Sequence, residues 1–140
     1  MAIGEKLFEE AGQVTGFKVV RVHPVEGTTL EVIAAFDVKG YGRFPSGKEM
    51  GSGTLTHYPH GITEAHFHGN LITAEGDQIL WWAQEKGRFG EDGKMKGVAL
   101  VSFYTNSQKH VWVNNLITIL ETEYDPQTQK VKTVGYEWKS

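Results

Sequence analysis

The chain has 140 residues, contains no cysteine and carries a formal net charge of −3 at neutral pH. A chain of this length is the size of one domain, and we interpret residues 1–140 as a single domain. The small negative charge gives no reason to expect nucleic acid or an anionic membrane surface as a partner. Without cysteine, the fold relies on neither disulfides nor thiolate metal sites.

The first residues carry Glu5, Glu9 and Glu10 where a secretory signal needs basic and then apolar residues. No apolar run approaches the length of a membrane span. These two observations predict a cytoplasmic protein with no membrane partner.

The composition favours strands over helices. Seventeen glycines stand against four prolines, and 11% of the residues are aromatic, as expected for short strands joined by tight turns. The segment 4–11 fits either one or two helical turns or a first strand. Beyond it, extended segments are predicted at 14–23, 29–38, 49–58, 62–74, 78–88, 96–105, 113–124 and 130–138.

Short turn signals such as Glu26-Gly27, Asp92-Gly93 and Asp125-Pro126 separate these segments. Short connections make sequential strands antiparallel neighbours, and closing such a meander leaves no exposed edge. The sequence therefore predicts an all-β fold, an antiparallel up-and-down barrel of about eight strands, similar in shape to calycins.

Cross-strand partners share a face, so the turns decide which side chains point inward. We place the hairpin centres at 59–60, 76–77 and 92–93. The face predicted to point inward holds Glu64, His66, His68, Asn70, Trp81, Ala83, Glu85, Val98, Leu100, Ser102 and Tyr104. The opposite face, predicted to form a subunit contact, holds Ala65, Phe67, Leu71, Leu80, Trp82, Val101 and Phe103.

The His66-Phe67-His68 segment has three interpretations. Two imidazoles on one face of a strand suit a metal, and together with Gly61 and Glu75 they nearly follow the first cupin motif. His110 and Asn114 are similar to part of the second cupin motif. Alternatively, His68 and Glu85 form an acid–base pair inside a cavity. In the simplest interpretation the histidines only line the cavity, and we expect no metal and no cofactor.

Four segments of the C-terminal third resemble the allene oxide cyclase-like barrel proteins of bacteria and archaea. They are 103–107, 113–116, 120–124 and the closing 136–139, with Asn114 before an apolar strand and Glu137-Trp138-Lys139 at the end. The resemblance implies an eight-stranded barrel with an interior cavity, assembled as a dimer or trimer. It also implies kinship in shape with allene oxide cyclases and dirigent proteins, which steer the cyclisation of apolar intermediates.

The sequence thus favours a barrel that binds an apolar or amphipathic small molecule in its interior and forms a homo-oligomer. One alternative is an isomerase or cyclase that templates its substrate in the cavity and uses His68 and Glu85 as catalytic residues. Another is a cupin-like metal-dependent enzyme, so the sequence leaves open whether the protein is an enzyme. The predicted ligand contacts are His66, Asn70, Trp81, Leu100, Ser102 and Tyr104.

Overall fold

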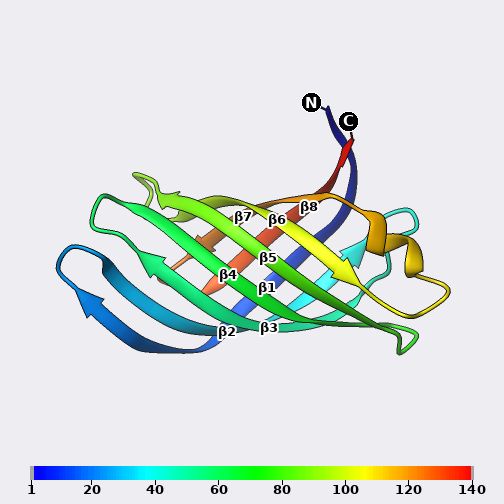
Figure 1. The fold of residues 1–140 in the computed structure, drawn as a ribbon, viewed down its shortest axis with the longest axis horizontal. Coiled ribbons are helices and arrows are strands. Elements are labelled where there is room, and N and C mark those ends of the chain that lie inside the picture. The colour runs from blue at the N-terminus through cyan, green and yellow to red at the C-terminus, as the bar shows by residue number, and fades with distance from the viewer. Residues whose placement is uncertain (1, 140) are drawn as a thin grey trace.

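The computed structural model describes residues 2–139, which form eight antiparallel strands in a single closed barrel (Figure 1). The predicted fold class is therefore confirmed. The strands follow chain order around the barrel, and one 3-10 helix, η1, precedes β7. The elements are β1 (Ala2–His23), β2 (Gly27–Gly40), β3 (Gly47–His57), β4 (Ile62–Thr73), β5 (Gln78–Phe89), β6 (Met95–Tyr104), η1 (Val111–Asn115), β7 (Thr118–Asp125) and β8 (Lys130–Lys139).

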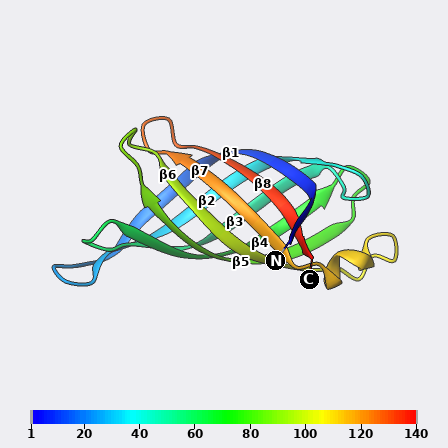
Figure 2. The same cartoon turned by 90° about the horizontal axis from the view of Figure 1, so that it is seen from above.

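β1 closes the barrel because it pairs with β2 along one edge and with β8 along the other. The two chain ends consequently lie side by side at one end of the barrel (Figures 1 and 2). The segment 4–11, for which helix and strand were both open, is part of β1. Register shifts near Thr15 and Val20 bend β1, as β-bulges do in strands that close a barrel. Within residues 2–139, no helix is long and apolar enough to cross a membrane.

One prediction of strand boundaries is wrong. Val113, Asn114 and Asn115 were expected in a strand, but they lie in η1, within the connection from β6 to β7. The Asn114 side chain accepts a hydrogen bond from the backbone N–H of Thr105 and donates one to its carbonyl. Both hydrogen bonds join Asn114 of η1 to Thr105, the residue that follows β6. They fix the β6–β7 connection at this end of the barrel.

This end of the barrel is filled by a tight aromatic core. The ring centroids of Phe8 and Phe44 lie 4.8 Å apart, and those of Phe44 and Phe103 lie 5.5 Å apart. Val113 of η1 is fully buried against the same core. The residues between β2 and β3, together with η1, therefore plug one end of the barrel.

Three hairpins share one turn geometry, which sets the faces of the strands. In the links β3–β4, β4–β5 and β5–β6, a hydrogen-bonded turn is followed by Gly61, Gly76 or Gly93 at positive φ. Each loop thus has three residues and a left-handed glycine in the last position, a common hairpin type. The predicted centre of each hairpin differs from the centre of the observed loop. The predicted pairing of each two neighbouring strands is therefore displaced by an odd number of residues. An odd displacement moves a side chain to the other face of its neighbour strand.

Candidate functional site: an apolar cavity with buried carboxyls

The barrel encloses a cavity of about 340 Å³. This volume lies within the range of roughly 300–1,000 Å³ that is typical of small-molecule sites. All eight strands contribute to the wall through their inward side chains, which are mostly apolar, including Leu30, Val32, Phe67, Trp81 and Val101. The cavity therefore suits a molecule with a largely apolar body.

The cavity opens at the end opposite the aromatic core. Its lining includes Phe17 and Phe89, which are 62% and 39% exposed, and Pro126 and Gln129 of the β7–β8 turn. Phe8 and Phe103, which belong to the aromatic core, lie at the other limit of the cavity. The cavity is thus a pouch with its floor at the plugged end.

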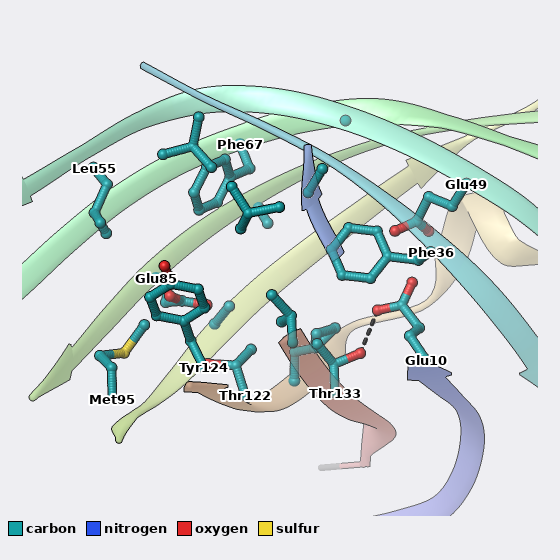
Figure 3. A pocket seen from close by; sticks show the side chains of 18 of the residues that line it. Glu10, Phe36, Glu49, Leu55, Phe67, Glu85, Met95, Thr122, Tyr124 and Thr133 are labelled. Carbon is teal, nitrogen blue, oxygen red and sulfur yellow. Dashed lines mark hydrogen bonds between the residues drawn. The ribbon is translucent and has the colours of Figure 1, made fainter. Parts of the chain in front are cut away.

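Two carboxyls occupy the floor of this pouch. Glu10 on β1 pairs with Val38, and Glu49 on β3 pairs with Leu71, both of them core residues. Each glutamate is 7% exposed and lines the cavity. Figure 3 shows the two side chains reaching toward one another, with the Thr133 hydroxyl donating a hydrogen bond to Glu10.

Burial governs the protonation of this pair. Burial raises the pKa of Glu10, and hydrogen bonds from Glu49 and Thr133 partly offset that increase. Burial raises the pKa of Glu49 well above its ordinary value, and the neighbouring charge of Glu10 raises it further. Two carboxyls in contact favour holding one proton between them, because both cannot easily ionise away from water.

A third carboxyl, Glu85, lies on β5, nearer the mouth of the cavity (Figure 3). Burial raises its pKa as well. The Thr122 hydroxyl is close enough to offset part of this increase, although it makes no hydrogen bond of normal geometry. His57 adds an imidazole to the wall, and burial lowers its pKa. The cavity wall thus contains acidic groups and no lysine or arginine among the described residues.

The structure divides the predicted site between the two faces of the barrel. Trp81 and Glu85 line the cavity, as their predicted roles require. The other predicted site residues were expected to point inward, and that expectation is wrong. Because the predicted registers are displaced by an odd number of residues, the opposite face of β4 and of β6 lines the cavity. The residues that lie on the outer face are His66, His68, Asn70, Leu100, Ser102 and Tyr104.

This division separates the predicted catalytic pair. His68 pairs with Trp82 on the outer face, whereas Glu85 pairs with Ala65 and points inward. The sheet therefore lies between the imidazole of His68 and the carboxyl of Glu85, and they cannot exchange a proton directly. The predicted His68 and Glu85 dyad is wrong.

The cupin-like hypothesis also lacks a donor set. His66 and His68 are exposed on β4, and residues 2–139 contain no group of three histidine, aspartate or glutamate side chains placed to hold a metal ion. Glu75 instead pairs with Lys109 at the surface. The His110 ring is buried, and its Nε2 atom lies 3.4 Å from a carboxylate oxygen of Asp77 beside the β4–β5 turn.

Sequence reasoning missed Glu10 and Glu49, the two buried carboxyls at the floor of the cavity. Glu10 lies in the segment for which helix and strand were both open, and as a strand residue it shares a face with Phe8. Glu49 and Leu55 lie on the same face of β3, because their positions along the strand differ by an even number of residues. The alternation was a usable signal, but a carboxylate on an apolar face is normally taken as evidence against burial.

A glutamine at position 49 tests the burial of this carboxyl. Because the folded-state pKa of Glu49 is raised, its contribution to stability is present below the ordinary value of 4.5 and is lost as pH rises through the raised pKa. We expect the free energy of unfolding of the wild type to fall as pH rises from the ordinary value of 4.5 through the raised pKa. In Glu49→Gln this fall should be shallower, and urea denaturation across that range measures it. An equal pH dependence in the two proteins would contradict the assignment, and Glu31→Gln on the outer face of β2 is the control.

The comparisons show the fold and leave the family open. No family model matches the chain, and no curated protein matches it by sequence. A protein of unknown function from Clostridium acetobutylicum is similar in structure, with a TM-score of 0.85 and 16% identity over 99% of this chain and 100% of that one. A beta-barrel like protein from Acinetobacter baumannii has a TM-score of 0.84 and 12% identity, covering 99% and 96%. An enzyme from Penicillium herquei has a TM-score of 0.65 and 17% identity, covering 95% and 92%. At these identities the chain shares a barrel fold with proteins that are mostly of unknown function.

Proposed function

We propose that the protein binds an apolar or amphipathic small molecule inside the barrel. The observation that carries this proposal is the apolar cavity of about 340 Å³ that opens at one end. Residual cavities destabilise proteins in proportion to their volume, so a cavity of this size is expected to serve binding. Trp81 and Phe67 supply apolar wall, and Glu10, Glu49 and Glu85 supply polar contacts.

Filling the cavity should weaken binding. Ala34 points into the cavity and Ala35 points outward on the same strand, so Ala34→Trp and Ala35→Trp form a matched pair. With the neutral fluorescent probe N-phenyl-1-naphthylamine, we expect Ala34→Trp to weaken binding about tenfold or more. Ala35→Trp should bind as the wild type does, provided that circular dichroism shows both variants folded. Equal binding by both variants would place the probe outside the barrel.

A second candidate function is proton transfer in the cavity. The allene oxide cyclase-like resemblance suggests an isomerase or cyclase. His68 lies on the outer face and cannot transfer a proton in the cavity, but the carboxyl pair of Glu10 and Glu49 lines the cavity and is suited to that role. One member can accept a proton while the other donates one, and the raised pKa values bring both closer to neutral pH. The Penicillium herquei enzyme shares the barrel shape alone, and fold does not transfer chemistry.

An apolar ketone tests proton transfer directly. In deuterium oxide, the wild type should accelerate hydrogen exchange beside the carbonyl of 1-tetralone by about a hundredfold or more over buffer. NMR follows the exchange. The double variant Glu10→Gln, Glu49→Gln should lose this acceleration, because both proton-transfer groups are gone. Exchange at the buffer rate in the wild type would leave binding as the only proposed function.

We also propose that the protein forms a cytoplasmic homo-oligomer through the outer face of β3 to β6. Trp82 is 51% exposed and Leu100 is 59% exposed there, with Met50, Leu80 and Tyr104 nearby. Of the residues predicted for the subunit contact, Leu80 and Trp82 lie on this outer face, whereas the others lie on the inner face: Ala65, Phe67, Leu71, Val101 and Phe103. Clustered exposed apolar side chains of this kind are typical of interfaces.

A charge on this outer face should separate the subunits. We expect sedimentation velocity to show a dimer or trimer for the wild type and a monomer for Trp82→Glu, because an interface cannot bury an unpaired carboxylate without cost. Val22→Glu, on β1 away from this face, should sediment as the wild type does. A wild-type monomer at micromolar concentration would refute the oligomer.

A further inference from the structure

The cavity contains three carboxyls for which the described residues provide no cationic partner. Glu10, Glu49 and Glu85 all line it, and no described lysine or arginine does. The ion pairs of lysine and arginine side chains instead involve exposed or partly exposed carboxylates, such as Asp37 with Lys48. Buried carboxylates without a paired cation destabilise the folded state, so the missing cation is a feature of the site that needs explanation.

A second observation points to a ligand that forms hydrogen bonds in the cavity. Glu85 forms no ion pair within the described residues, and the buried Thr122 hydroxyl beside it has no hydrogen bond of normal geometry. At the floor, the Thr133 hydroxyl donates a hydrogen bond to Glu10. Within residues 2–139, the Thr122 hydroxyl and the indole N–H of Trp81 are thus buried in the cavity wall without a hydrogen-bond partner, although buried polar groups in native proteins are usually satisfied.

We propose that the ligand is a small apolar molecule that carries a protonated amine, and that its ammonium group binds at Glu10 and Glu49. This inference rests on the proposed binding function and names its ligand class. An ammonium presents three N–H donors, which suits two adjacent carboxyls. Phe36 lies beside the pair in Figure 3, and an aromatic ring adds a favourable cation–π contact.

Binding of the ammonium group moves a proton in a defined direction. The free pair holds one shared proton, and the incoming positive charge favours the form in which both carboxyls are ionised. The shared proton leaves to the solvent, and the ammonium nitrogen keeps its own protons and its charge. The amine must therefore bind more tightly as pH rises, up to the pH at which the ammonium itself loses its proton.

Three compounds with the same body and different head groups test the proposal: 4-phenylbutan-1-amine, 4-phenylbutan-1-ol and 4-phenylbutanoate. Isothermal titration calorimetry at neutral pH should show the amine binding at least about tenfold more tightly than the alcohol, and the carboxylate binding most weakly. Repeating the titration in two buffers of different ionisation enthalpy should reveal proton release with the amine and none with the alcohol.

The double variant Glu10→Gln, Glu49→Gln should lose the preference for the amine while it still binds the alcohol. Glu31→Gln should keep the preference, because Glu31 is exposed on the outer face of β2. If the wild type binds the alcohol as tightly as the amine, or if the double variant keeps the preference, the amine inference is wrong and the binding function stands. If neither amine nor alcohol binds the wild type, both proposals are overturned.

Discussion

Closure of the sheet between β1 and β8 is the constraint on which the rest of the structure depends. Once the eight strands form a cylinder, every second side chain points to a common interior, and the size of those side chains decides what the interior contains. At one end they are aromatic and pack with Phe44 and η1 into a core. Farther along, small residues such as Ala34 and Ala83 line the wall and leave space. A dense core and an open cavity therefore coexist in one barrel.

The polar groups inside this cavity do not follow from the stability of the fold. Glu10 and Glu49 are nearly as inaccessible as the aromatic core, and their pKa values are raised by the same burial. Apolar residues of similar volume would fill these positions with less cost to the folded state. Local violations of packing rules are expected at functional sites, where stability is exchanged for binding or chemistry. The floor of the cavity is the strongest such violation in the barrel.

The architecture could be predicted from the sequence, because turn signals and alternating segments specify eight sequential strands. The site could not be predicted in full. Whether a side chain points into the barrel depends on whether the hairpin loop beside its strand has an odd or an even number of residues. Gly61, Gly76 and Gly93 each end a three-residue loop at positive φ, and the loop centres taken from the sequence missed this. Trp81 and Glu85 were placed in the cavity, whereas His66 and His68 were assigned to the wrong face.

The start of β1 and the connection to β7 show a second limit of sequence reasoning. Residues 4–11 have no decisive periodicity, and pairing with β2 and β8 makes them a strand. Asn114 looked like the start of a strand, but its side chain closes the end of β6 instead. In both cases long-range partners outweigh the local pattern.

The central claim is that a small apolar molecule binds inside the barrel, and the methionines offer a direct test. Met95 is buried in the cavity wall, whereas Met50 is 70% exposed on the outer face of β3. In protein labelled with ¹³C at the methionine methyl groups, titration with 4-phenylbutan-1-ol should shift the NMR signal of Met95 to saturation and leave that of Met50 unchanged. A saturable shift of Met50 alone, or no shift of Met95 as the ligand binds, would contradict binding inside the barrel.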